Sequence, residues 1–339
     1  MPDPGTTKPK LRLIDTQPIQ YEGEKYLLLR DPLMLTETTL LVPEPMIPAL
    51  VLCDGTRNLE TLRAALALRY GLFLTTQRVA EFIQALDDAL LLENERSSQA
   101  RAEAQRLFQQ AGYRPPASAG QSYPDDPQAL AALLQGYISQ LDGDVKPANG
   151  PVRGIISPHI DYDRGGPVYA SVWSRAARSV READLAIIFG TDHFSEGYPI
   201  TLTRQNYATP FGVLPTDVAL VDKLARVIGE EAAFAGELHH RREHSIELDA
   251  VWMHYIRGGE PISLVPILTG SLDSTGQQLD GPVLDALLEV LRQGMAGRKA
   301  IVVAAGDLAH VGPAFDSNPV DAEALKVLQI ADDELIQAM

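Results

Sequence analysis

Four apolar runs in the C-terminal part of the chain constrain its fold most strongly. They are residues Val152–Ile156, Leu185–Gly190, Ile262–Leu268 and Ala300–Ala305. Each run is short and almost continuously hydrophobic, as strands that are buried on both faces are. Segments with apolar residues at helical spacing lie between the runs, at 169–180, 217–228 and 246–255. This alternation predicts an α/β domain in which helices cover both faces of a sheet.

Polar side chains that can bind metals lie at or near the ends of these elements. They occur in four segments, at residues 158–161, 190–193, 243–247 and 306–310. Ligands in open α/β sheets bind beyond the carboxyl ends of strands. Two histidines and a carboxylate can hold zinc or iron and leave coordination positions open. A lone histidine such as His159 has an alternative interpretation, as a loop side chain that bonds a backbone carbonyl; the convergence of four segments favours a site.

Composition argues against several other classes of function. The 339 residues include 29 Lys and Arg against 45 Asp and Glu, a formal net charge of −16, whereas nucleic-acid binding needs clustered cations. Cys53 is the only cysteine, which excludes an internal disulfide and a site built from cysteines. No apolar run approaches the roughly 20 residues that span a bilayer, and no signal peptide is visible. We therefore expect a cytoplasmic protein with no nucleic-acid or membrane partner.

Residues 1–96 predict a small winged-helix-like α+β domain. Two β-prone runs, 26–30 and 39–42, precede two helices capped by Asn58 and by Thr75 or Thr76, and a short strand is expected at 90–92. A helical and Pro-rich linker at 97–116 would separate this domain from the second one, 117–339.

The pattern Asp54-Gly55-Thr56-Arg57, helix, Tyr70-Gly71, helix, Leu90-Leu91-Leu92 resembles PqqD-like domains. That resemblance implies that the first domain binds a peptide or a partner protein. DNA binding is the competing interpretation, and ten Lys and Arg against fourteen Asp and Glu in residues 1–100, a net charge of −4, disfavour it. A purely structural appendage is the other alternative.

Seven motifs of the second domain occur in a characteristic order. They are Ala119-Gly120 to Tyr123-Pro124, Ile156-Ser157-Pro158-His159, Gly190-Thr191-Asp192-His193, Thr209-Pro210-Phe211-Gly212, Glu243-His244-Ser245-Ile246-Glu247, Val265-Pro266-Ile267-Leu268-Thr269-Gly270 and Asp307-Leu308-Ala309-His310. Over about residues 114–315 they resemble the Memo family, whose bacterial members are called AmmeMemoRadiSam system protein B. The resemblance implies a three-layer α/β fold shared with the class III extradiol dioxygenases, which use non-haem Fe(II).

The resemblance also implies roles for individual residues. His159 and His193 match the metal-site histidines of the family, and His244 matches the acid–base histidine of the dioxygenases. Family members often have a cysteine where this chain has Ala309. We therefore expect Asp307 to be the third metal ligand, with His310 as the alternative. Fe(II) is the expected metal, Zn or Cu are the other choices, and a degenerate site would hold none.

Several other polar residues are expected to act indirectly. Asp161 and Asp192 would cap helices or orient a histidine, and Glu243 would do the same or interact with a helix N-terminus. The remaining histidines of the second domain, His239, His240 and His254, are expected to be solvent-facing or structural.

The leading functional hypothesis is a non-haem iron redox enzyme that works with a radical-SAM partner on a small molecule or peptide. A non-enzymatic scaffold that binds a peptide in the same pocket, and a metal-dependent hydrolase, are the alternatives. Memo-like chains continue beyond the last motif, so we interpret the end at Met339, in a helix expected at 321–339, as a truncation or a natural loss. A homodimer or substitute packing would then cover the exposed sheet edge.

Overall fold

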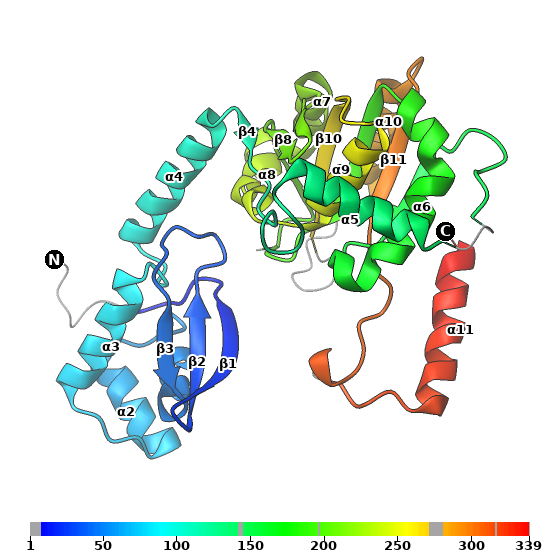
Figure 1. Ribbon diagram of the computed structural model, residues 1–339. Coiled ribbons are helices and arrows are strands. Elements are labelled where there is room, and N and C mark those ends of the chain that lie inside the picture. The colour runs from blue at the N-terminus through cyan, green and yellow to red at the C-terminus, as the bar shows by residue number, and fades with distance from the viewer. Residues whose placement is uncertain (1–7, 142–144, 196, 271–280, 316, 339) are drawn as a thin grey trace. The chain divides into compact units, whose positions relative to one another are not determined.

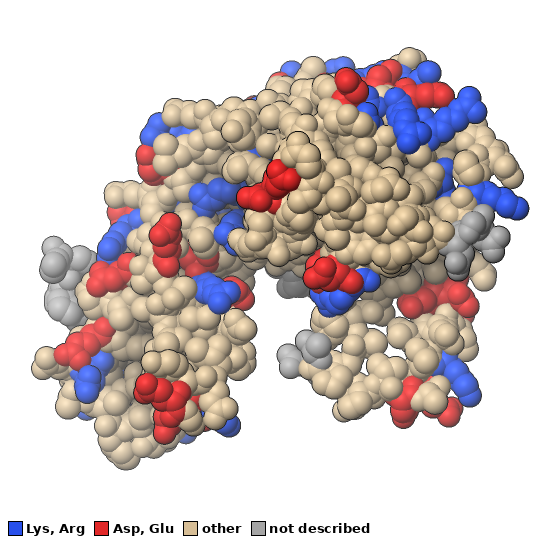
Figure 2. All heavy atoms as spheres, viewed as in Figure 1, with Lys and Arg blue, Asp and Glu red and all other residues tan. Residues whose placement is uncertain are grey.

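The computed structural model describes residues 8–141, 145–195, 197–270, 281–315 and 317–338. The chain divides into two compact units, Met1–Ala111 and Gly112–Met339 (Figure 1). None of the described helices combines the length and the apolar composition that crossing a bilayer requires. On the face shown in Figure 2, acidic and basic side chains are interspersed over each unit.

The first unit combines an antiparallel sheet with a group of helices. Its strands are β1 (Asp15–Tyr21), β2 (Glu24–Arg30) and β3 (Leu40–Pro43), in that order in the sheet. Its helices are η1 (Glu44–Met46), α1 (Ile47–Val51), α2 (Leu59–Tyr70), α3 (Thr76–Asp88) and α4 (Glu95–Gln110). The β-prone runs 26–30 and 39–42 correspond to β2 and β3, which pair antiparallel. The caps are confirmed as well, since the Asn58 and Thr75 side chains accept hydrogen bonds from backbone N–H groups of α2 and α3.

The strand expected at 90–92 is wrong. Among the described residues, this segment makes only an isolated bridge between Leu11 and Leu92. Leu90 has a φ of 56°, and the Leu91 N–H bonds back to Leu86 at the end of α3. The chain therefore closes the helix with a left-handed residue before it can extend.

The second unit is an α/β domain, as predicted. Its main sheet has the order β5-β11-β6-β10-β7. The strands are β5 (Gly154–Ser157), β6 (Leu185–Thr191), β7 (Ile200–Leu202), β10 (Ser263–Thr269) and β11 (Ala300–Ala305). All neighbours are parallel except β7, which pairs with β10 antiparallel. Because β5, β6, β10 and β11 run in one direction, their carboxyl ends meet at one edge.

Helices pack on both faces of this sheet. One face is covered by α5 (Pro127–Ser139), α6 (Tyr162–Glu182) and α9 (Ser245–Ile256). The other is covered by α7 (Val218–Ile228), α8 (Glu230–Phe234) and α10 (Gly281–Met295). Consecutive β6 side chains alternate between the two cores, with Ala186 and Ile188 on the first and Leu185 and Ile187 on the second. This explains why the run is hydrophobic throughout.

Smaller elements complete the unit. A three-stranded sheet contains β4 (Tyr113–Arg114), β8 (Asn206–Thr209) and β9 (Gly212–Leu214). The 3-10 helices are η2 (Glu237–Arg241) and η3 (Pro313–Phe315), and α11 (Ala322–Ala338) corresponds to the last predicted helix. None of the described α11 residues is buried.

Candidate metal centre

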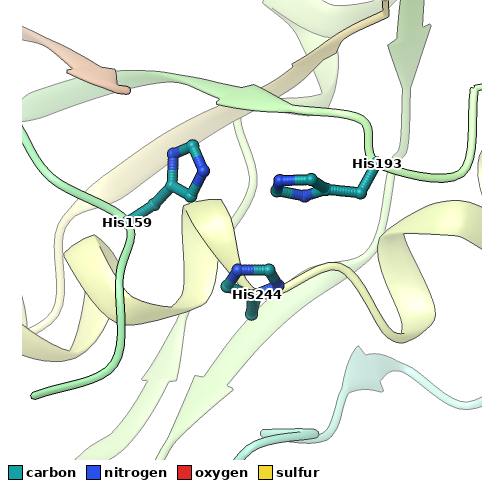
Figure 3. Close-up of side chains that lie close together, drawn as sticks. All are labelled: His159, His193 and His244. Carbon is teal, nitrogen blue, oxygen red and sulfur yellow. The ribbon is translucent and has the colours of Figure 1, made fainter. Parts of the chain in front are cut away.

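The parallel strands bring the predicted histidines together at the carboxyl edge of the sheet. His159 follows β5 by two residues, His193 follows β6 by two residues, and His244 directly precedes α9. One ligand atom from each lies within 4.8 Å of the others. Figure 3 shows the three rings around a common space. Their centroids are 5.1 Å apart for His159 and His193, and 4.9 Å apart for His193 and His244.

Gly190 allows α9 to approach β6 closely enough to place His244. A Cβ atom at this position would lie 2.5 Å from the Ser245 Oγ and 2.5 Å from the Ile246 Cγ1. The Ser245 hydroxyl also donates to the Thr191 carbonyl, over 3.1 Å. The start of α9 therefore packs directly on the strand that leads to His193.

The His159 ring is held in one tautomer by the backbone. Its Nδ1 lies 3.1 Å from the Ala305 carbonyl oxygen, which can only accept a hydrogen bond. Nδ1 therefore carries the proton, and Nε2 keeps a lone pair for a metal. The ring is buried, and the backbone N–H of His159 donates to Asp307 over 2.8 Å.

Glu243 holds the other two histidines. Its buried carboxylate accepts backbone N–H groups of His193, His244 and Ser245 over 2.8–3.0 Å. It also lies 3.0 Å from the His193 Nδ1 and 3.3 Å from the His244 Nδ1. Burial opposes ionisation, but the bond to His193 and the nearby imidazoles lower the pKa of Glu243 to about 2. Glu243 thus orients both rings through Nδ1, as expected of an indirect role.

The imidazoles respond differently to this environment. The hydrogen bond to Glu243 raises the pKa of His193. Burial lowers the pKa of His244, despite the same carboxylate. His244 therefore favours the neutral form, which has a free lone pair for a metal or a proton.

Asp307 and His310 lie next to the three-histidine group. The Asp307 carboxylate is 3.6 Å from the His159 Nε2 and 3.5 Å from the His310 Nε2. The side chain of Asp307 is 13% exposed and that of His310 is 47% exposed. Asp307, expected as third ligand, therefore contacts a predicted ligand, while His310 lies further out.

The remaining predicted residues have structural partners. Asp161 caps α6 through the Arg164 N–H and forms an ion pair with the Arg164 side chain. Asp192 accepts from the Phe194 N–H and pairs with the buried His239 at 2.8 Å. Both lie beside a predicted ligand in sequence, but neither is part of the three-histidine group.

His239, His240 and His254 are all buried, so the solvent-facing interpretation is wrong and the structural one holds. The Tyr207 hydroxyl and the Thr201 carbonyl bind the two ring nitrogens of His240. Burial lowers its pKa to about 3. The Thr209 hydroxyl and the Gly259 carbonyl likewise bind the two ring nitrogens of His254.

A buried ion pair behind the histidines was not predicted from the sequence. Arg114 pairs with Glu247 at 2.5 Å, and both side chains are fully buried. Arg114 also donates to the carbonyls of His240 and Glu243, and Glu247 accepts the Ala117 and Ser118 N–H groups. A charged residue inside the apolar run 246–256 was the available signal, since such a residue needs a partner.

The histidines line a cavity of about 600 Å³. Asp307, His310 and Asp161 share it, together with Arg164 and Arg242. Apolar side chains, among them Phe194 and Leu248, complete the wall. The volume is in the range of pockets that hold small molecules.

Comparisons with known proteins give the family. The family model described as Memo-like protein matches residues 114–339. A MEMO1 family protein of Aquifex aeolicus is 28% identical over 327 residues, which cover 95% of this chain and 82% of the relative. A MEMO1 family protein of Methanosarcina acetivorans is 30% identical over 216 residues, 63% of this chain and 74% of the relative. The chain belongs to the Memo family.

Proposed function

We propose that the second unit holds Fe(II) at His159, His193 and His244 and oxidises a small molecule or a modified peptide. The main support for this proposal is the group of three imidazoles, whose ligand atoms lie within 4.8 Å of one another. Each Nδ1 faces an acceptor, either the Ala305 carbonyl or Glu243, which leaves Nε2 for the ion. Imidazole ligands suit transition metals such as iron, zinc and copper.

The residues around the group support a division of roles. A bound Fe(II) ion would supply open coordination positions for substrate and dioxygen. His159 and His193 would hold the ion from the ends of β5 and β6, which lie on either side of β11, and His244 would be the third ligand. Asp307, 3.6 Å from the His159 Nε2 and partly exposed, would accept a substrate proton. In the opposite assignment His244 carries the proton, as the family resemblance implies, and Asp307 is the third ligand in place of the cysteine that family members often have in this segment.

Two variants separate these assignments. Asp307→Asn should keep the iron and lose most of the activity, whereas His244→Ala should lose the iron. Iron content is measured by elemental analysis after anaerobic loading, and activity by oxygen consumption with catechol. Iron lost in Asp307→Asn and kept in His244→Ala would reverse the roles. Ester hydrolysis by the zinc-loaded protein, without oxygen consumption by the iron-loaded one, would support a hydrolase instead.

We propose further that the first unit binds a peptide or a partner protein, with a radical-SAM enzyme as the partner. Leu68 is 87% exposed and Phe73 is 85% exposed, and these two apolar side chains, five residues apart, are the surface that we propose for the partner. Co-elution of the full chain with such an enzyme should be lost in Leu68→Ser with Phe73→Ser. Leu107→Ser, on the exposed side of α4, should retain it.

A further inference from the structure

The cavity that contains the three histidines also contains two arginines with different surroundings. Arg164 is neutralised by Asp161, whose carboxylate lies 2.6 Å from the Arg164 Nε. Arg242 lines the same cavity and has an exposed side chain. Among the residues that the structure describes, no carboxylate or carbonyl binds its guanidinium. The pocket therefore presents one uncompensated cation.

The position of Arg242 follows from its neighbours. It lies between η2 and Glu243, and its backbone N–H bonds to the His239 carbonyl over 3.1 Å. The adjacent Glu243 is fixed by His193 and His244, so the backbone of Arg242 is tied to the metal pocket. A free guanidinium on a fixed backbone is suited to bind an anion.

We propose that Arg242 binds the carboxylate of the substrate, so that the substrate is a small carboxylic acid whose other end faces the three histidines. This inference rests on the proposed metal site. A guanidinium forms a bidentate pair with a carboxylate, so one arginine is enough to bind one carboxylate. A phosphate dianion would need more positive charge than a cavity that also contains Asp161 and Asp307 provides. Phe194 and Leu248 offer apolar contact for the body of such an acid.

The test compares two probes that differ in one carboxylate. Iron-loaded protein is titrated anaerobically with 3,4-dihydroxybenzoate and with catechol, and both dissociation constants are measured by calorimetry. The wild-type protein should bind the acid about 10- to 100-fold more tightly, which is the range for a charge-assisted hydrogen bond. Arg242→Gln should reduce this ratio to about one, and Arg242→Lys should give an intermediate value because it lacks the planar fork.

Two controls make the result specific. Arg226→Gln removes an exposed arginine from α7, away from the cavity, and should leave the ratio unchanged. The double variant Asp161→Asn with Arg164→Gln removes both partners of the ion pair and leaves the net charge of the cavity unchanged, so it should change the ratio less than Arg242→Gln does. An unchanged ratio in Arg242→Gln, with iron content equal to wild type, would overturn the inference.

The failure of the metal site is distinguishable from the failure of this inference. If the wild-type protein binds no iron, the proposed function fails, and metal-free protein is titrated with benzoate and benzyl alcohol. Preferential binding of benzoate that disappears in Arg242→Gln supports the carboxylate site. Equal binding of both probes by wild type, or preferential binding retained in Arg242→Gln, overturns it.

Discussion

On one side of the histidine pocket, His193 and His244 are held by a buried carboxylate, whereas on the other side Asp307 and His310 follow β11 in a partly exposed segment. The Glu243 carboxylate accepts three backbone N–H groups on the first side. On the second side, Leu308 is 42% exposed and His310 47% exposed at the side chain. The difference indicates that one half of the site is preorganised, while the other half faces the solvent and the substrate.

The largest expected effect comes from the buried ion pair behind the preorganised half. Arg114→Ala should lower the free energy of unfolding by about 3–5 kcal/mol, because Glu247 is left as an unpaired buried charge. Chemical denaturation of the full chain measures it. Arg178→Ala, which breaks a pair between exposed side chains, should cost less than about 1 kcal/mol. Similar losses in both variants would mean that the pair does not support the site.

Removal of the carboxylate that orients two rings should weaken metal binding. Glu243→Gln should reduce the affinity for Fe(II) by about 10- to 100-fold, the usual effect of losing a group that orients ligands. Competition with a chelator measures the affinity. Glu231→Gln, an exposed carboxylate of α8, is the matched control and should leave it unchanged. If both variants bind iron equally well, Glu243 has no orienting role.

His240, whose backbone carbonyl accepts a hydrogen bond from Arg114, should contribute to the pH dependence of stability. Burial lowers the pKa of His240 from 6.5 to about 3, so the folded protein keeps it neutral while the unfolded chain takes up a proton. The contribution of neutral His240 to the free energy of unfolding is fully present above pH 6.5. It is lost as the pH falls toward 3, by at most about 1.4 kcal/mol per pH unit. The unfolding free energy of wild type minus that of His240→Gln should decrease as the pH falls from 6.5 toward 3. A constant difference would contradict the assignment.

The exposed half should tolerate change best. Leu308→Ala should alter the free energy of unfolding by no more than about 0.5 kcal/mol, because half-exposed side chains of this kind contribute little. Iron affinity should remain equal to that of wild type. A loss comparable to that of Glu243→Gln would show that the segment after β11 is as constrained as Glu243.

The sequence predicted which side chains lie together better than what holds them in place. Strand-end motifs brought His159 and His193 to one edge, because parallel strands place their carboxyl ends there. His244, which precedes α9, was expected beside them from the family resemblance, as the acid–base residue. Arg114 contacts the carbonyls of His240 and Glu243, which are 126 and 129 residues away, and no local pattern reports such contacts. Strand β1 was missed because it is exposed and polar and carries no apolar signal.

Anaerobic titration with Fe(II), followed by elemental analysis, tests the central claim that the three histidines form one metal site. We expect one iron per chain in wild type and Leu308→Ala, and loss of the iron in His159→Ala and in His193→Ala. Circular dichroism confirms that the variants remain folded. A folded wild-type protein that binds no iron, or histidine variants that bind it as tightly as wild type, would contradict the account.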